Sequence, residues 1–343
     1  MMASSNARNW PSRLAVQKIR LVNYRTPDVR RSTAQLTTSL MAFCLAWTLA
    51  WASLRVSYAL TLLLAIPTAG CMVRLFVLQH DCGHGSLFRS RMANEIVGFF
   101  LGVLTMTPFQ CWRRYHNTHH ATSSNLDRRG YGDVRMLTVR EYAGLSPRGK
   151  FAYRVYRSPL VLFGVGPFLQ FVVRQRFAYY VPKDWKIERW SVHATNAAIL
   201  ACAYGMARLV GLAPFLAVQL PVMALAASMG VWLFYVQHQF DGTYWRRRPE
   251  WDYVSAGMLG SSYYVLPPVL RWFTASIGLH HIHHLDSKIP NYRLQECLDE
   301  NPELARAPRL TLWSSLACAS LKLWDEDAGR MVRTYALAQE ESR

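Results

Sequence analysis

The sequence predicts an all-α integral membrane protein with four transmembrane helices in two hairpins and a cytosolic helical cap that carries clustered histidines. Three observations predict it: long apolar runs with almost no charge, basic residues concentrated in the segments outside them, and the spacing of the histidines. The 343 residues are 51% hydrophobic and 17% charged, whereas an average soluble domain is about 25% charged. The 13% aromatic content excludes a disordered chain. Seven cysteines without a C-x-x-C pair exclude a disulfide scaffold.

Four apolar runs are predicted to cross the bilayer, because about 20 helical residues span its hydrocarbon core. Residues 35–54 carry no charge, and residues 57–78 carry only Arg74. A second pair follows at about 194–210 and 213–236, where the only charge is Arg208 near the turn. The connector within each pair is very short, so each pair is expected to form a helical hairpin.

The distribution of basic residues predicts the orientation of these helices. Lys and Arg number 39, and 36 of them lie in residues 1–34, 79–192 and 237–343. The positive-inside rule places these segments in the cytosol and both hairpin tips on the other side. We therefore expect a cytosolic N-terminal arm (1–34), a membrane domain (35–300) and a cytosolic C-terminal tail (301–343). The net charge of +18 comes without a nucleic-acid-binding motif, so nucleic acid is not an expected partner.

The histidines are the strongest signal in the chain. Nine of the eleven fall in three windows: HDCGH at 80–84, HNTHH at 116–120 and HHIHH at 280–284. Spacings of three and four residues put the histidines of each window on one helix face, except His281, which points off it. His238 follows the fourth predicted helix at the same membrane surface. Of the two histidines outside this pattern, His193 is expected to be structural, and His281 to be structural or to support a ligand.

These clusters can meet only on the cytosolic side. Three shorter apolar runs, 96–111, 159–173 and 263–279, are each broken by Pro or Gly and are marginal for spanning. If 96–111 crossed the membrane, the first two clusters would lie on opposite faces. If 159–173 crossed, His238 would be left outside. Convergence of the clusters therefore requires both runs to be re-entrant or interfacial.

Eight or nine imidazoles are enough to hold two metal ions. Imidazole suits Fe, Zn, Cu and Ni, and a closed zinc site would use only four ligands. A dinuclear iron site rich in histidine, at a membrane surface, is suited to activating O2 against an unactivated C–H bond. Cys82 lies between two histidines but is expected to be a small packing residue.

The three motifs together resemble those of the integral-membrane fatty acid desaturases, over about residues 35–300. HDCGH at 80–84 and the IPNY at 289–292 that follows the third cluster are similar to the bacterial acyl-lipid Δ12 (omega-6) type. The resemblance implies a non-haem di-iron centre that uses O2 to introduce a cis double bond into a lipid acyl chain, converting oleoyl to linoleoyl chains. The ligands it implies, carried over by position, are His80, His84, His116, His119, His120, His238, His280, His283 and His284.

The resemblance also implies partners. No flavin, NAD, haem or iron–sulfur motif is present, so electrons are expected from an external donor such as a ferredoxin or a cytochrome b5-like protein. The basic cytosolic face would attract an acidic donor. The protein is expected in a bacterial cytoplasmic membrane, with both termini and the active site in the cytosol.

Neighbouring polar and aromatic residues are predicted to support the site. Asp81, Asn117 and Asp286 flank histidines and are expected to orient imidazoles. Residues 99–112 and 232–245 are candidates for the walls of an apolar substrate channel, the latter with Trp232, Phe234, Tyr235 and Trp245.

Three other functions remain open on the sequence alone. A related membrane oxygenase that hydroxylates an alkane, fatty acid or carotenoid would use the same histidine spacing. A metal transporter would place histidines within the spanning helices, where this sequence has none. A zinc-dependent membrane hydrolase would bind zinc and no iron.

Overall fold

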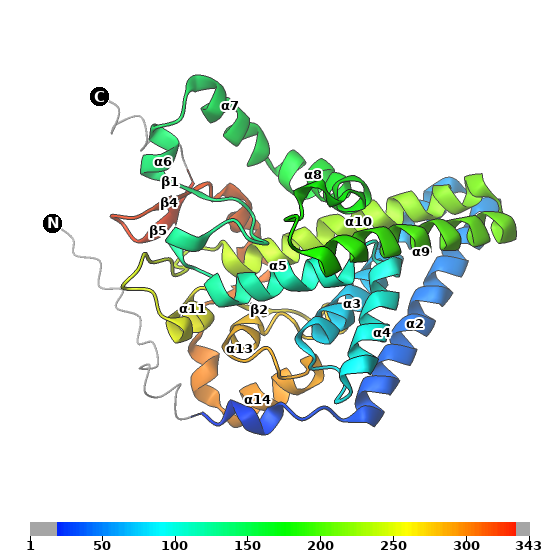
Figure 1. The fold of residues 1–343 in the computed structure, drawn as a ribbon, viewed down its shortest axis with the longest axis horizontal. Helices are drawn as coiled ribbons and strands as arrows, with labels where there is room; N and C mark the ends of the chain where they lie inside the picture. Colours follow the sequence, from blue (N-terminus) through cyan, green and yellow to red (C-terminus); the bar gives the residue numbers. More distant parts are fainter. Residues whose placement is uncertain (1–18, 334–343) are drawn as a thin grey trace.

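The longest elements of the computed structural model, which describes residues 19–333, are two helical hairpins. In the first, α2 (Val29–Ala52) returns as α3 (Tyr58–His84). In the second, α9 (Lys186–Val210) returns as α10 (Leu212–His238). The hairpins lie side by side and project together from the rest of the molecule (Figure 1). The predicted all-α membrane architecture with two hairpins is confirmed.

Three helices are individually long and apolar enough to cross a membrane: Val29–Arg55, Tyr58–His84 and Leu212–His238. They contain the predicted spans 35–54, 57–78 and 213–236. The fourth predicted span, 194–210, lies within α9, which is not among the three because Asn196 and Arg208 interrupt its apolar part. The count of four spans therefore stays a prediction.

Local sequence signals set the ends of the first hairpin. The carboxylate of Asp28 caps α2 by accepting hydrogen bonds from the backbone N–H groups of Arg30 and Arg31. Ser57 caps α3 in the same way through the N–H of Leu60. α3 ends at Gly85, whose φ of +67° is a left-handed conformation that glycine adopts without steric cost. α3 is thereby stopped directly after His84.

The shorter apolar runs form bent elements. α4 (Arg91–Leu104) and α5 (Phe109–Thr122) meet at 103°, and α7 (Pro147–Tyr156) meets the helical segment Leu160–Arg176 at 56°. By length and composition each pair is a broken span or a re-entrant loop. Residues 263–279 form a short strand and a single short helix instead. Within residues 19–333, none of the three runs forms a straight helix of spanning length.

Most of the remaining elements are short and build a cap at the end of the hairpins opposite their tips. Two small sheets tie this cap together: β1 pairs in parallel with β4 and β4 pairs with β5 antiparallel, while β2 and β3 pair in parallel. The strands are β1 (Leu137–Thr138), β2 (Tyr263–Val265), β3 (Arg309–Thr311), β4 (Leu323–Asp325) and β5 (Arg330–Val332).

The other α-helices are α6 (Val139–Ala143), α8 (Gly166–Phe168), α11 (Tyr253–Leu259), α12 (Pro268–Phe273), α13 (His280–Leu285), α14 (Leu294–Glu300) and α15 (Leu312–Leu316). Two π-helical stretches flank α8, η4 (Leu160–Val165) and η5 (Leu169–Val173). The 3-10 turns are η1 (Leu21–Tyr24), η2 (Ser53–Arg55), η3 (Leu126–Arg128), η6 (Arg174–Arg176), η7 (Ala178–Tyr180), η8 (Asn291–Arg293), η9 (Pro302–Arg306) and η10 (Ala317–Ser320).

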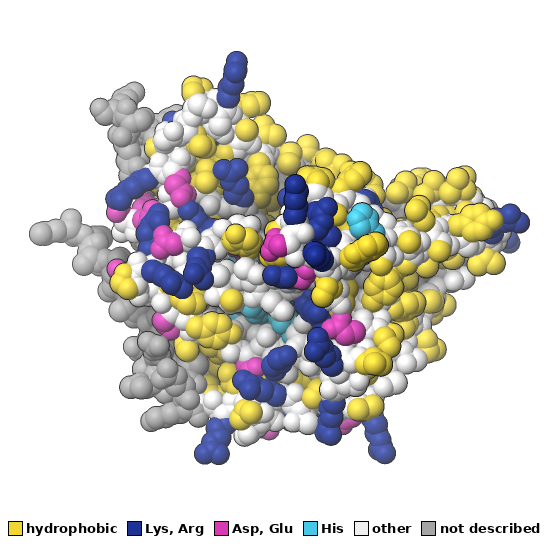
Figure 2. Space-filling model, viewed as in Figure 1, with side chains coloured by type: hydrophobic (Ala, Val, Ile, Leu, Met, Phe, Trp, Pro, Cys, Tyr) yellow, Lys and Arg dark blue, Asp and Glu magenta, His cyan; other side chains and the backbone are white. Residues whose placement is uncertain are grey.

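The core is centred on α3, which packs against α2, α4 and α10. From Thr68 to Cys82 nearly every residue of α3 is buried. Figure 2 shows hydrophobic side chains over the projecting hairpins and Lys and Arg side chains over the cap, with a further basic group at the hairpin tips. This division of the surface matches the expected membrane and cytosolic parts.

The ends of the described chain pack onto the cap. Tyr24 is buried and its hydroxyl bonds to the carboxylate of Glu300, and Arg25 pairs with Asp286 at 2.6 Å. Met331, in β5, is buried as well. The parts of the predicted N-terminal arm and C-terminal tail that lie within residues 19–333 are therefore docked, while the predictions for 1–18 and 334–343 lie outside the described residues.

Candidate metal centre

Four helices bring the clustered histidines together at the end of the hairpins. His80 and His84 occupy the last turns of α3, and His238 is the last residue of α10. α5 carries the second window and α13 carries the third. The rings of the nine predicted ligands form one continuous set of contacts, and none lies in the middle of a spanning helix. The arrangement does not favour the transporter alternative.

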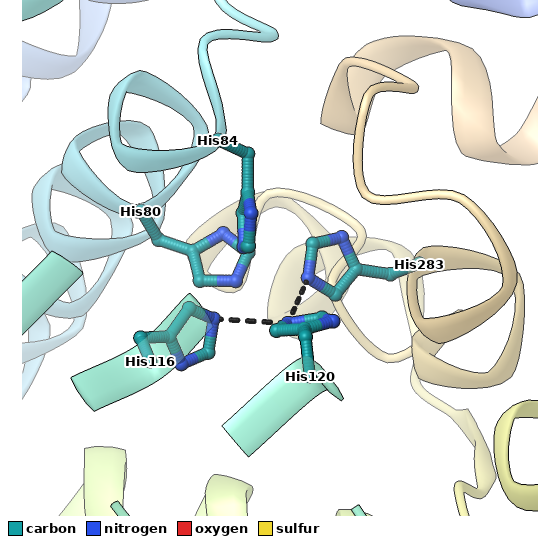
Figure 3. A group of neighbouring side chains, drawn as sticks. All are labelled: His80, His84, His116, His120 and His283. Carbon is teal, nitrogen blue, oxygen red and sulfur yellow. Dashed lines mark hydrogen bonds between the residues drawn. The ribbon is translucent and has the colours of Figure 1, made fainter. Parts of the chain in front are cut away.

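Five of these histidines form a first group. In His80, His84, His116, His120 and His283 one ring nitrogen of each lies within 4.8 Å of all the others. Their rings point toward a common centre (Figure 3). The Nε2 atoms of His116 and His120 are 3.1 Å apart, and those of His120 and His283 are also 3.1 Å apart.

A second group lies directly beside the first. Ring nitrogens of His119, His238 and His284 lie within 4.8 Å of one another, and the Nε2 atoms of His119 and His238 are 3.2 Å apart. His280 adjoins this group, since its Nε2 is 2.9 Å from that of His238. The rings of His120 and His284 stack with centroids 4.1 Å apart and so link the two groups. The histidines therefore form two adjacent groups, each with ring nitrogens close enough together to bind one metal ion.

The chemistry of these nitrogens fits metal ions. A neutral imidazole has one N–H donor and one lone pair. Hydrogen bonds between the rings therefore cannot satisfy all of the nitrogen atoms that lie so close together. Within residues 19–333, the Nε2 atoms of His80, His84 and His284 are buried without a hydrogen-bond partner. Burial, reinforced by neighbouring imidazoles, lowers the pKa of His283 and His284 well below the usual value, so these rings are neutral, as ligation requires.

Carboxylates and a carbonyl hold three of the rings from behind. The Nδ1 of His119 is hydrogen-bonded to the carboxylate of Asp133. The Nδ1 of His80 lies 3.3 Å from Asp81 Oδ1, and the Nδ1 of His238 lies 3.3 Å from the carbonyl of Gly260. Such contacts fix which ring nitrogen carries the proton and leave Nε2 free to bind.

Of the three residues predicted to orient imidazoles, only Asp81 does so. Its second oxygen accepts from the backbone and side-chain nitrogens of Asn291, each at 2.8 Å. Asn117 is exposed, and the expectation for it is wrong because it lies about 100° around α5 from His116. The expectation for Asp286 is also wrong, since its carboxylate accepts from Arg25 and from the backbone of Lys288.

Asp133 was missed from the sequence. It follows a turn in which Gly130 and Gly132 both have positive φ, +99° and +72°, and the backbone of Gly132 passes close to α5. The glycines are the sequence signal for a sharp turn, and an acidic residue directly after them was the available hint.

The two unassigned histidines lie apart from the groups. His281 is fully buried beside the ring of Tyr263, and burial lowers its pKa to about 3. It is therefore a neutral core residue that belongs to neither nitrogen group. His193 is exposed on α9 next to Trp190. Cys82 is buried within α3.

A cavity of about 660 Å³ reaches the first group. Its walls are mostly apolar and come from α3, α5, the segment 161–175 and α10, and His80, His116 and His280 are among the residues that line it. Of the aromatic residues predicted as channel walls, Trp112 and Phe234 line it, and Trp112 also stacks on His116 with ring centroids 4.5 Å apart. Trp232, Tyr235 and Trp245 do not line it.

Comparison with known proteins agrees with these features. The family model described as fatty acid desaturase matches residues 53–315. A fatty acid desaturase of Bacillus subtilis is 43% identical over 314 residues, covering 92% of this chain and 89% of the relative. An sn-1 acyl-lipid omega-3 desaturase (ferredoxin) of Synechocystis and a Delta(12)-fatty-acid desaturase of Vernicia fordii are each 25% identical. Each of these two matches covers 66% of this chain and 62% of the relative.

Proposed function

Because this chain belongs to the fatty acid desaturase family, we propose that its clustered histidines hold two iron ions and that it places a cis double bond in a lipid acyl chain. Family membership makes the protein an O2-dependent oxidoreductase bound to a membrane, with a lipid acyl substrate. The observation that carries the proposal of two metals is the pair of adjacent nitrogen groups, five histidines in one and three in the other, with His280 beside the second.

The residues of the chain bind and position what reacts. Irons bound to the histidines would supply the redox chemistry with O2 that removes hydrogen from an unactivated carbon. Phe76, Trp112 and Phe234 line the cavity that would hold the acyl chain and exclude water from it. Asp133 and Asp81 keep a proton on Nδ1 of His119 and His80, so that Nε2 of each ring would be free to hold a metal.

Over the whole reaction, two hydrogens leave adjacent carbons of the chain. O2 takes up these hydrogens together with two protons and two electrons from the donor, and two water molecules form. The 17 Lys and Arg residues of 79–192 and the 12 of 237–343 support an acidic, ferredoxin-like protein as donor. They also support a cytosolic active site in a bacterial cytoplasmic membrane.

For the bond position we propose Δ12, the conversion of oleoyl to linoleoyl chains. HDCGH at 80–84 and IPNY at 289–292 support it, as do the activities named for the distant relatives, which include Δ12 and omega-3 desaturation. Mass spectrometry that locates the new double bond tests this assignment separately from desaturation itself.

Fatty acid profiling is the decisive experiment. Expression in a host rich in monounsaturated lipids, with an active electron donor, should yield dienoic chains only when O2 is present. The variants His116→Ala and His284→Ala, one from each nitrogen group, should abolish the product and lower the iron content. The exposed His193→Ala is the matched control and should retain both. An unchanged profile with the wild-type protein would refute the function.

A further inference from the structure

One stretch of the cavity lining is polar, although the walls are mostly apolar. Gln170, Arg174, Gln175 and Tyr180 all line it. They come from η5 and the turns that follow it, and π-helical turns of this kind occur frequently at functional sites. Arg174 and Gln170 are held together, since Nη1 of the arginine donates to Oε1 of the glutamine at 3.2 Å. The guanidinium also lies 5.1 Å above the ring of Tyr180 and is therefore oriented in advance.

This polar group has hydrogen-bonding capacity that the protein does not use. Arg174 makes no ion pair with any residue of 19–333. Gln175 is only 7% exposed, and its Oε1 is buried without a partner among the described residues. An unpartnered buried amide costs stability, and this one belongs to a side chain that lines a cavity. The observation indicates that a polar ligand group completes the site.

The surroundings place this polar group at the level of lipid headgroups. Tyr179 is 74% exposed directly before Tyr180, and Trp190 is exposed at the start of α9. Exposed Tyr and Trp gather at membrane–water interfaces. The exposed residues of the preceding turns are apolar, namely Leu160, Val165 and Leu169. The segment 160–180 thus has lipid on its outer side and the cavity on its inner side.

We propose that Arg174, with Gln170, Gln175 and Tyr180, binds the polar end of an intact phospholipid whose acyl chain occupies the cavity. The guanidinium takes the phosphate, and Oε1 of Gln175 accepts a hydrogen bond from a hydroxyl of the lipid's polar end. This inference rests on the proposed function and adds to it the form in which the acyl chain is presented. The lipid stays in the inner leaflet, and its chain enters past the segment 160–180.

The charge of the site favours a phospholipid over a coenzyme A ester. Arg174 is the only Lys or Arg among the described residues that line the cavity, and Asp133 also lines it. A single guanidinium matches the single negative charge of a phosphodiester and forms strong charge-assisted hydrogen bonds with it. Coenzyme A carries several phosphate charges, which this cavity lining does not match.

The test compares two lipids that differ only in the phosphate-containing headgroup. Iron-loaded protein in dodecyl maltoside micelles is given dioleoyl phosphatidylglycerol or dioleoylglycerol, with a ferredoxin, its reductase and NADPH. Arg174→Gln should raise KM for phosphatidylglycerol about tenfold or more, leave kcat unchanged and leave KM for dioleoylglycerol unchanged. Gln175→Leu should raise KM for both lipids, since the polar end of each carries a hydroxyl that can donate to Oε1 of Gln175. Arg174→Lys keeps the positive charge and should raise KM for phosphatidylglycerol less than Arg174→Gln does.

Lys183→Gln is the matched control, because Lys183 is exposed nearby and does not line the cavity. Binding of spin-labelled phosphatidylglycerol to metal-free protein gives a second readout, which Arg174→Gln should weaken. Equal effects of Arg174→Gln on both lipids, no effect on either, or a lower KM for oleoyl-CoA than for phosphatidylglycerol would overturn the inference. If wild type converts no lipid, the proposed function is wrong, and the binding measurement still decides the subsite.

Discussion

Removing the carboxylate of Asp133 should selectively weaken one of the two metal positions. Asp133 bonds to Nδ1 of His119, and the two side chains are only 12% and 2% exposed. In Asp133→Ala the buried N–H of His119 loses its acceptor, and the ring loses the contact that fixes its orientation. A hydrogen bond to a charged group contributes about 1.5–3 kcal/mol. At about 1.4 kcal/mol per tenfold, metal affinity at the second nitrogen group should fall roughly 10- to 100-fold, the range typical of such partners.

The assay is a metal titration of metal-free protein with Fe(II) under anaerobic conditions. Wild type should bind two equivalents tightly, and Asp133→Ala should bind one equivalent as wild type does and the other more weakly. Asp133→Asn keeps an acceptor oxygen without the charge, so its affinity for the second equivalent should lie between those of wild type and Asp133→Ala.

Asp327→Ala is the control, because it removes the same charge from an exposed pair with Arg140 that contributes little. Thermal unfolding of the metal-free variants shows whether the fold is kept. Two equivalents bound by Asp133→Ala with wild-type affinity would refute the role given to this carboxylate.

Two further predictions concern the cavity and the cap. Gly230 lines the cavity and no atom lies within 4 Å of a Cβ placed there, so Gly230→Leu should shorten the acyl chains that are converted, as chromatography of the products would show. Gly205→Leu, equally open but on α9 away from the cavity, should leave the products unchanged, and the same shift in both variants would contradict the assignment. Arg157 is fully buried and donates to Tyr235 and to the backbone of Arg135 and Leu321; Arg157→Met should cost about 3 kcal/mol of unfolding free energy, measured by thermal unfolding in detergent. Arg148 is exposed, so Arg148→Met should change the unfolding free energy little. Equal stability of the two variants would argue against a stabilising role of Arg157.

The helix faces of the histidine windows could be predicted because helical periodicity is local. Spacings of three and four residues fixed which imidazoles point together, and the turn at Gly85 directly after His84 agrees with a helix that ends there. The hairpins followed equally directly from long apolar runs that each contain at most one charged residue. These properties depend on neighbours in the sequence, and they needed no knowledge of the tertiary fold.

Contacts between distant segments could not be predicted in this way. Asp81 orients His80 as expected, but Asp286 accepts a hydrogen bond from Arg25, which is 261 residues away in the sequence. Asp133 reaches His119 through a glycine turn whose path depends on packing against α5. The π-helical turns that bring Gln170 to the cavity leave no periodic signal in an apolar run. Each of these contacts depends on which segments the tertiary fold brings together.

The proposal that histidines from four helices hold a pair of iron ions can be tested directly. Its most direct test is metal analysis of the purified protein combined with anomalous X-ray diffraction at the iron absorption edge. We predict two irons per chain, one bounded by the group that contains His116 and the other by the group that contains His284. A single zinc, or no metal between these groups, would contradict the account.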